Sequence, residues 1–122
     1  MNKVFLKGNM VRDPEIRMVN ISEKQVKVAN FTIAVSRSFK KANGEKDQDT
    51  TFVNCEAWDS GADFISKYIV KGDPMLIEGS LKMENWEKDG QKLSRMKVRV
   101  SNFEKLNRAP TKATNEEAPS DY

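Results

Sequence analysis

Two long segments of the sequence alternate between apolar and polar residues. Residues 26–39 and 50–58 are rich in β-branched and aromatic side chains, and apolar and polar residues alternate over most of their length. A period of two is typical of β-strands and differs from the period of an α-helix. Asn43-Gly44 lies between the segments, and both residue types tolerate the positive φ angles of tight turns. The sequence therefore predicts a β-hairpin here.

The same pattern recurs in the second half of the chain. Residues 74–87 and 91–105 have a strand-like composition, and Asp89-Gly90 separates them. These segments predict a second hairpin. A further strand is expected at about residues 3–11, which brings the predicted strands to five.

One segment between the hairpins has helical periodicity instead. It opens with Ser60-Gly61-Ala62-Asp63, which is similar to a capping box, and Lys71-Gly72 is expected to end it. Its apolar residues fall on one side of a helix: Ala62, Ile65, Tyr68 and Ile69. Three strands, one helix and two strands is the element order of the OB-fold. We predict an all-β protein, an OB-fold five-stranded barrel with one helix between strands 3 and 4, in residues 1–106.

Histidine is absent and cysteine occurs once. This composition excludes His-based acid–base catalysis, zinc sites of the usual Cys/His kind and an intrachain disulfide. The N-terminus lacks the apolar run of a signal peptide, and no window is long enough for a membrane span. We expect a protein of a reducing compartment, the cytoplasm, with no membrane association, no metal and no cofactor.

The alternation also separates core positions from surface positions. In residues 51–58 the predicted core set is Thr51, Val53, Cys55 and Ala57, which places Phe52 and Trp58 on the open face. In residues 75–86 the predicted core set is Met75, Ile77, Gly79, Leu81 and Met83, which places Trp86 outward. Phe39 has the parity of the core residues Phe31, Ile33 and Val35, but it lies where its strand runs out, so we place it at the rim.

Cations accompany these aromatic side chains. In the last strand Met96, Val98 and Val100 are expected to point inward, and Arg95, Lys97 and Arg99 outward. The net charge of +3 is too small to identify a partner by itself, but unpaired bases offer ring faces for stacking and phosphates attract cations. The candidate phosphate-contacting residues are Arg37, Lys40, Lys41, Lys82, Lys92, Arg95 and Lys97.

Protein can also cover large aromatic side chains on a polar face. Another subunit or a second layer of the same chain can do so as well as a stacked ligand can. The single thiol, Cys55, has core parity and no His partner, so we expect a buried structural residue and not a nucleophile.

The C-terminal residues differ from the rest. Residues 107–122 contain no Val, Ile, Leu, Met, Phe or Trp, and their acids are Glu116, Glu117 and Asp121. Such a segment buries too little apolar surface to offset the entropy of ordering. We predict a disordered, acid-tipped tail.

A series of motifs along the chain has a distinctive order and spacing. The chain opens with Met1-Asn2-Lys3-Val4-Phe5-Leu6-Lys7-Gly8-Asn9-Met10-Val11-Arg12-Asp13-Pro14-Glu15-Ile16-Arg17. Further motifs follow in order: Val28-Ala29-Asn30-Phe31-Thr32-Ile33-Ala34-Val35-Ser36, Phe52-Val53-Asn54-Cys55-Glu56-Ala57-Trp58, Lys71-Gly72-Asp73, Ile77-Glu78-Gly79-Ser80-Leu81 and Trp86-Glu87-Lys88-Asp89-Gly90-Gln91. Over about 105 residues the chain resembles the bacterial and phage single-stranded DNA-binding proteins.

The resemblance implies a non-enzymatic protein that binds and protects single-stranded DNA, without strong sequence preference, during replication, recombination and repair. It implies an OB-fold with base stacking on Phe39, Phe52, Trp58 and Trp86. It also implies homotetramers, with a dimer as the alternative, built by pairing first strands and covering apolar surface such as Phe5.

The tail departs from that family. Its cellular members end in a Gly/Pro/Gln-rich linker and an acidic tip closing with Ile-Pro-Phe, whereas this chain ends in Glu116-Glu117-Ala118-Pro119-Ser120-Asp121-Tyr122. A short tail with this tip suits a phage- or plasmid-encoded member, which would act in the host cytoplasm at the nucleoid. Recruitment of replication or recombination proteins by Glu116, Glu117, Asp121 and Tyr122 and a purely solubilising role are both open.

Two other function classes compete with this hypothesis. One is an OB-fold module for RNA, or a replication accessory factor whose aromatics contact protein. The other is a small metal-dependent nuclease, for which the sequence offers only scattered acids such as Asp47, Asp49, Glu56, Glu78 and Glu84.

Overall fold

The computed structural model describes residues 1–107. The elements are β1 (Val4–Met10), β2 (Glu15–Ile21), β3 (Lys24–Lys40), β4 (Lys46–Trp58), α1 (Ser60–Tyr68), β5 (Pro74–Lys88) and β6 (Gln91–Lys105). All five predicted strands and the helix are present. β2 is an additional strand that the sequence analysis missed. The predicted disorder of the tail lies outside the described residues, except for Asn107.

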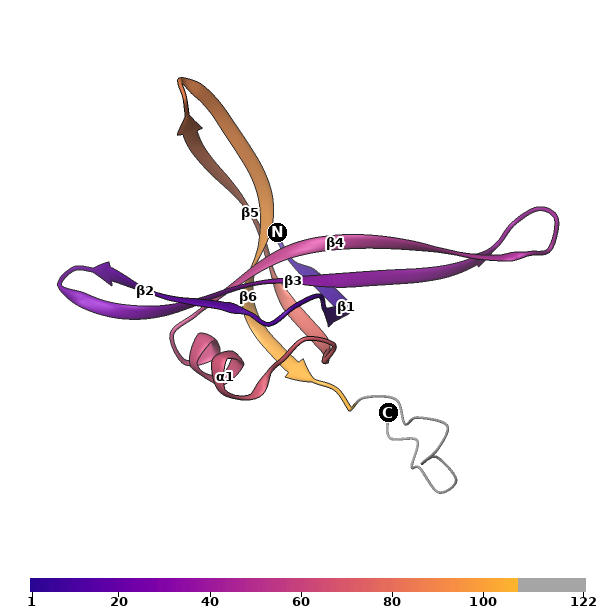
Figure 1. Ribbon diagram of the computed structural model, residues 1–122, viewed down its shortest axis with the longest axis horizontal. Coiled ribbons are helices and arrows are strands. Elements are labelled where there is room, and N and C mark those ends of the chain that lie inside the picture. The colour runs from indigo at the N-terminus through magenta and orange to yellow at the C-terminus, as the bar shows by residue number, and fades with distance from the viewer. Residues whose placement is uncertain (108–122) are drawn as a thin grey trace.

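The strands form one sheet that closes on itself (Figure 1). Their order is β1-β5-β6-β4-β3-β2, and β1 also pairs with β3, which closes a barrel of five strands and leaves β2 outside it, on β3. The pairing of β4 with β6 is parallel, at Cys55 with Val98 and Glu56 with Arg99, and the other pairings are antiparallel. This is the predicted OB-fold barrel.

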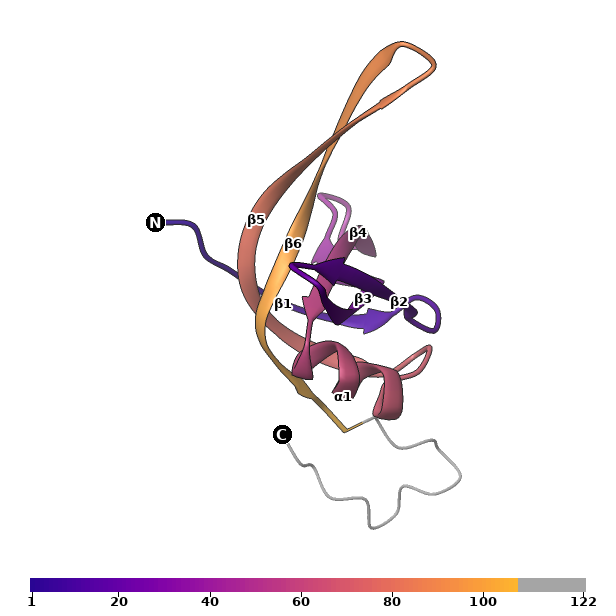
Figure 2. The ribbon, with the colours of Figure 1, turned by 90° about the vertical axis from the view of Figure 1, so that its left-hand side faces the viewer.

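The core fills the barrel and the space under α1. The helix contributes Ala62 and Ile65, and Ile69 follows it directly; all three are at most 2% exposed, and the helix lies at the end of the barrel away from the tip of the β5–β6 hairpin (Figure 2). The buried residues of the strands include Phe31, Ile33, Cys55, Ala57, Met75, Ile77 and Val98. Each predicted core set is therefore confirmed only in the part of its strand that lies in the barrel.

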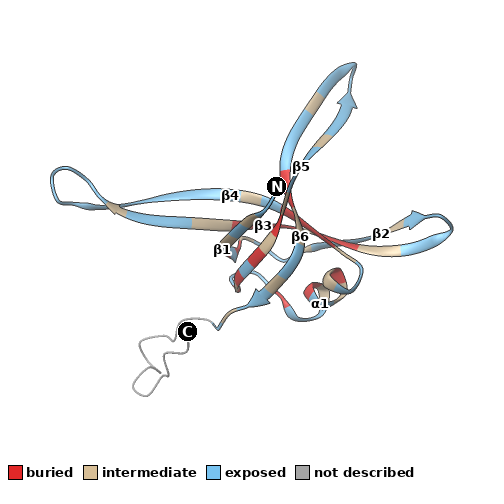
Figure 3. Cartoon of the chain, turned by 180° about the vertical axis from the view of Figure 1, so that it is seen from behind, coloured by how far each residue is buried: buried red, intermediate tan, exposed pale blue. Residues whose placement is uncertain are grey.

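Three hairpins extend beyond the barrel, and their outer parts are exposed on both faces (Figure 3). The prediction of core positions fails there. Leu81, Met83 and Met96 are 44%, 49% and 50% exposed, and Thr51 is also exposed. Alternation predicts which face a side chain is on, but no second layer covers that face once the strands leave the barrel.

The two predicted turns are confirmed. Asp89 and Gly90 have φ angles of 51° and 79° between the paired residues Lys88 and Gln91. Gly44 has a φ angle of 88° in the turn between β3 and β4.

The helix begins at Ser60, as predicted, but the predicted side-chain capping is wrong. Asp59, with a φ angle of 58°, precedes the helix, and its side chain makes no capping hydrogen bond. In the first turn the backbone N–H of Asp63 donates a hydrogen bond of 2.9 Å to the carbonyl of Asp59, and Ala62 is buried. Tyr68, which we placed on the core side, is 56% exposed.

The register of β5 and β6 shifts where Glu78 pairs with Asn102 and Gly79 with Val100, which leaves Ser101 of β6 as a bulge. Next to this bulge β6 lies very close to Gly79. A Cβ at position 79 would overlap the carbonyl of Arg99 and would lie 2.9 Å from Cγ1 of Val98. Only glycine leaves room for this approach. Within residues 1–107, no helix is long and apolar enough to span a membrane.

Candidate nucleic-acid interface

The four aromatic side chains expected to stack on bases come from three strands. Phe52 and Trp86 are 65% and 41% exposed, which confirms that alternation places them outward. Trp58 and Phe39 are half-buried. We call these four residues the aromatic set.

Three rings of this set have a guanidinium over the ring. The Cζ atom of Arg99 is 4.7 Å from the ring centroid of Trp58, and that of Arg95 is 5.5 Å from the centroid of Trp86. Arg37 lies 5.3 Å from the centroid of Phe39. Such distances are within the range of cation–π attraction.

Each of these arginines is also paired with a carboxylate. Nε of Arg95 donates a hydrogen bond of 3.0 Å to Glu84, and Nε of Arg99 is 3.6 Å from Oε2 of Glu56. A terminal nitrogen of Arg37 is 3.4 Å from Asp49. The repeated unit is therefore a carboxylate, a guanidinium and an aromatic ring.

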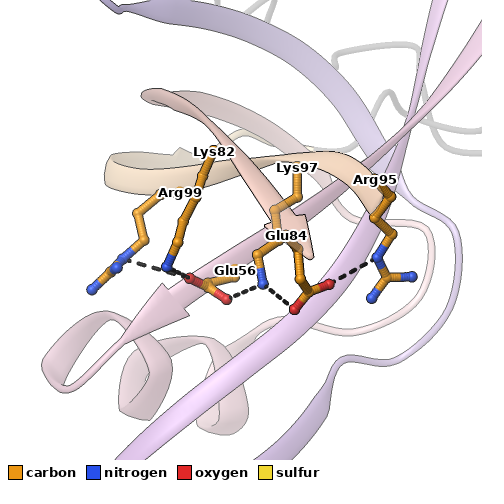
Figure 4. A network of polar contacts seen from close by, with 6 residues as sticks. All are labelled: Glu56, Lys82, Glu84, Arg95, Lys97 and Arg99. Atoms are coloured by element: carbon orange, nitrogen blue, oxygen red, sulfur yellow. Dashed lines mark hydrogen bonds and ion pairs between the residues drawn. The ribbon is translucent and has the colours of Figure 1, made fainter. Parts of the chain in front are cut away.

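Lys97 joins two of these units at the centre of the site (Figure 4). Its Nζ atom lies 2.6 Å from Oε1 of Glu56 and 2.9 Å from Oε2 of Glu84. The side chain of Lys97 is only 7% exposed, and that of Glu56 only 2%. The prediction that Lys97 faces the solvent is therefore wrong, because two acids surround its ammonium group.

The pairing of the strands explains this arrangement. Glu56 precedes Trp58 by two residues and Glu84 precedes Trp86 by two, so each acid lies on the same side of its strand as its ring. In β6 the residues on the corresponding face are Arg95, Lys97 and Arg99. β6 runs between β4 and β5, which pairs Glu56 with Arg99 and Glu84 with Arg95. We call Arg99, Glu56, Lys97, Glu84 and Arg95 the ion-pair chain.

The contacts of the chain stabilise its charged forms. Burial raises the pKa of Glu56, but the hydrogen bond and charge of Lys97 outweigh this and hold the pKa below its ordinary value. Hydrogen bonding to Lys97 likewise lowers the pKa of Glu84. Desolvation lowers the pKa of Lys97, yet its hydrogen bonds to both glutamates raise the pKa overall. All three groups are therefore charged at neutral pH.

Two buried polar atoms of the site lack a hydrogen bond within residues 1–107. Oε2 of Glu56 and Nε1 of Trp58 are buried and have no hydrogen-bond partner within the described part of the chain. Oε2 faces Arg99 at 3.6 Å and Nζ of Lys82 at 3.9 Å, which are ion-pair distances and not hydrogen bonds.

The remaining predicted phosphate-contacting residues lie around this centre. Lys41 is 3.5 Å from Asp47, whereas the exposed Lys40 and Lys92 have no carboxylate partner within residues 1–107. Lys92 and Trp86 line a pocket of about 470 Å³ at the β5–β6 hairpin.

A groove of about 450 Å³ lies between β2 and the β5–β6 hairpin. Arg12, Arg17 and Arg95 line it, together with Glu84 and Lys97. The sequence analysis missed Arg17 because it missed β2, and it also missed Arg12, which lies between β1 and β2. The alternation in Ile16-Arg17-Met18, followed by a turn at Ser22 and Glu23, was the available signal.

Cys55 is a buried thiol, as predicted. It is 2% exposed, and burial raises its pKa to about 12. Among the residues that the structure describes, no group of three or more His, Cys, Asp or Glu side chains could hold a metal ion. The tail residues Glu116, Glu117, Asp121 and Tyr122 lie outside the described range.

The closed barrel, with aromatic rings and cations outside it, defines an OB-fold of the kind that binds extended ligands on its surface. Residues 1–106 match the model of the single-strand binding protein family. The chain belongs to this family.

Individual proteins agree with this assignment. The single-stranded DNA-binding protein 2 of Streptococcus pyogenes is 36% identical over 113 residues, which cover 92% of this chain and 66% of that protein. The single-stranded DNA-binding protein of Fusobacterium nucleatum is 35% identical over 77% of this chain and 59% of its own length. This chain thus spans about three fifths to two thirds of the length of these relatives.

The fold also matches solved structures. A Plasmodium falciparum SSB in complex with ssDNA superimposes with a TM-score of 0.76 at 24% identity, over 88% of this chain and 96% of the other. A deletion mutant of the single-stranded DNA binding protein from Thermus aquaticus gives a TM-score of 0.73 at 24% identity, over 88% of this chain and 51% of the mutant chain.

Proposed function

We propose that this chain binds single-stranded DNA without strong sequence preference and protects it during replication, recombination and repair. The observation that carries the proposal is the aromatic set, three of whose rings lie beside arginines on the outside of an OB-fold barrel. The family membership and the names of the relatives support it. Its role is binding and not catalysis.

Stacking supplies the part of the affinity that does not depend on charge. Every base has a π-face, so exposed rings bind any sequence, and each stacked base contributes about 1–3 kcal/mol. Phe52 and Trp86 present the most open rings, whereas Trp58 is partly covered. Two of the four rings are Phe, which offers less stacking area than Trp.

Phosphate contacts supply the rest. Lys40 and Lys92 are exposed, and the paired side chains of Lys41, Lys82, Arg37 and Arg95 are about half exposed or more. Each contact with a phosphate releases condensed counterions, so affinity falls as salt rises. We leave Lys97 out of this group because its ammonium is enclosed by Glu56 and Glu84.

We further propose that the protein acts in the cytoplasm, at the nucleoid, as a homotetramer or a dimer. Phe5 on β1 is 67% exposed, a large apolar side chain that a second copy would cover. Replication or recombination proteins are the proposed partners of the acidic C-terminal residues.

The test uses the intrinsic fluorescence of the two tryptophans. Titration with oligo-dT should quench the emission of Trp58 and Trp86, and Trp86→Ala should weaken binding by about ten-fold or more. Tyr68→Ala removes an exposed aromatic of α1 whose ring packs on Phe64 and is not one of the aromatic set, and should leave the affinity unchanged.

The controls separate the competing functions. Absence of quenching, with equal affinities for the unaltered protein and Trp86→Ala, would reject the stacking surface. Equal affinity for oligo-U would favour an RNA-binding module. Loss of intact oligonucleotide during incubation with magnesium would favour a nuclease.

A further inference from the structure

We propose that three carboxylates hold three arginines in the unbound protein, and that phosphates of the DNA replace these carboxylates at the arginines on binding. The pairs are Glu84 with Arg95, Glu56 with Arg99 and Asp49 with Arg37. The inference rests on the proposed function and adds its mechanism: DNA binding exchanges a carboxylate for a phosphate at an arginine that already lies beside a stacking ring. Arg99 becomes a further phosphate-binding residue, and Lys97 becomes a positioning residue.

The two ion pairs of Lys97, at the centre of the ion-pair chain, are not replaced by phosphate contacts. Lys97 bridges Glu56 and Glu84 at 2.6 and 2.9 Å, and its side chain is 7% exposed. Separating charges that are withdrawn from water leaves each of them unpaired at a high free-energy cost. The two carboxylates therefore stay fixed when a ligand arrives.

The ends of the chain differ in this respect. The side chains of Arg95 and Arg99 are 55% and 42% exposed. Ion pairs of exposed side chains contribute little net free energy, because water solvates the separated charges well. A phosphate therefore replaces the carboxylate more readily at Arg95, whose partner Glu84 is 32% exposed, than at Arg99, whose partner Glu56 is 2% exposed.

The geometry of the guanidinium groups favours the same exchange. Arg95 uses Nε for Glu84, and its terminal nitrogens point away from that carboxylate (Figure 4). A guanidinium presents five N–H donors in one plane, an arrangement that binds phosphate in a bidentate manner. Because the same group lies over Trp86, a nucleotide could place its base on the ring and its phosphate on Arg95.

A third unit repeats the arrangement outside the ion-pair chain. Arg37 lies over Phe39 and pairs with Asp49, with side chains that are 70% and 65% exposed. Asp49 makes no contact with Lys97, so this unit can be altered without disturbing the buried centre.

The test compares acids that hold such an arginine with acids of the same hairpins that hold none in the described part of the chain. Glu84→Gln should tighten binding of oligo-dT by about 1.4- to 5-fold more than Glu87→Gln, which removes the same charge from the same strand. The slope of log affinity against log salt should steepen by up to about 0.7 in Glu84→Gln, because the variant has no released carboxylate that takes up a counterion when Arg95 moves to the phosphate. Glu87→Gln should leave the slope unchanged.

A double-mutant cycle identifies the arginine. In an Arg95→Gln background the excess effect of Glu84→Gln should disappear. Asp49→Asn provides the same test at Arg37, with Glu45→Gln in the neighbouring turn as its control, and it does not depend on the buried centre.

Three results would overturn the exchange: equal effects of Glu84→Gln and Glu87→Gln, an excess that persists without Arg95, or equal effects of Asp49→Asn and Glu45→Gln. If Glu84→Gln fails to fold, the Asp49 comparison decides. If the unaltered protein binds oligo-dT and these comparisons fail, only the exchange is wrong. If the unaltered protein does not bind oligo-dT, the proposed function itself is wrong.

Discussion

The ammonium group of Lys97 lies 2.6 Å from the carboxylate of Glu56, and both side chains are almost completely withdrawn from water. A charged pair in this position is stable only as a pair, because each member alone would be a desolvated ion. Glu84 completes the arrangement at 2.9 Å. Lys97 thus contacts both acids whose arginine partners lie over Trp58 and Trp86.

Replacement of Lys97 should therefore cost far more than replacement of a neighbouring lysine. We expect Lys97→Met to lower the free energy of unfolding by about 3–5 kcal/mol. Lys82→Met removes a half-exposed ammonium 3.9 Å from the same Glu56 carboxylate, and should cost less than about 1 kcal/mol. Urea unfolding of both variants measures the difference. Similar losses would show that Lys97 is not held as a buried pair.

The acid groups of the ion-pair chain predict a pH dependence of stability. The pKa of Glu84 is lower in the folded protein than its ordinary value, so its contribution is present above the unfolded pKa of about 4.3. It is lost as the pH falls through the lower, folded value. The stability difference between the unaltered protein and Glu84→Gln should accordingly be largest at neutral pH and shrink in acid. Unfolding curves between neutral pH and pH of about 3 test this, and a constant difference would contradict it.

Phosphate contacts should appear in the salt dependence of binding. Lys92→Gln and Lys82→Gln should each reduce the slope of log affinity against log salt by about 0.7 for single-stranded DNA. The loss should be similar for different base compositions. Lys67→Gln changes the charge equally, but Lys67 pairs with Asp63 of its own helix and makes no ion pair with the ion-pair chain, so it should not alter the slope. An effect of Lys67→Gln as large as that of Lys92→Gln would indicate a response to net charge alone.

The close approach of β5 and β6 gives a prediction about stability. Gly79→Ala forces a methyl group against the backbone of Arg99 and the side chain of Val98, and should cost about 1–3 kcal/mol. Gly61→Ala is the matched control, because its nearest atom, Cε1 of Phe103, would be 3.5 Å away. Thermal unfolding should show a lower midpoint for Gly79→Ala only. Equal midpoints would mean that the bulge adjusts without loss.

Much of the barrel could be predicted because burial and alternation agree there. Cys55, Ala57, Met75 and Ile77 are buried, and each lies on the face that the strand period predicts. The alternation does not predict burial outside the barrel. Leu81 has the parity of the core residues but is exposed, because its part of β5 extends beyond the barrel. β2 was missed because most of its residues are exposed, and its pairing with β3 stabilises it more than burial does.

The aromatic set could be predicted from the same alternation, but the ion-pair chain could not. The charge and parity of Lys97 both indicate an exposed side chain. Its burial depends on two acids from β4 and β5, the strands that pair with β6 on its two sides. The alternation along one strand gives no information about which strands lie beside it in the sheet.

The buried centre also restricts how this sequence can change over generations. Loss of Lys97 alone would leave Glu56 and Glu84 facing each other without their shared cation, and loss of either acid would leave the ammonium undercompensated. Apolar residues that replace the whole cluster together, however, can be as stable as the ions. Substitutions at these three positions should therefore be inherited together, so that descendants of this chain keep all three residues or replace them as a group.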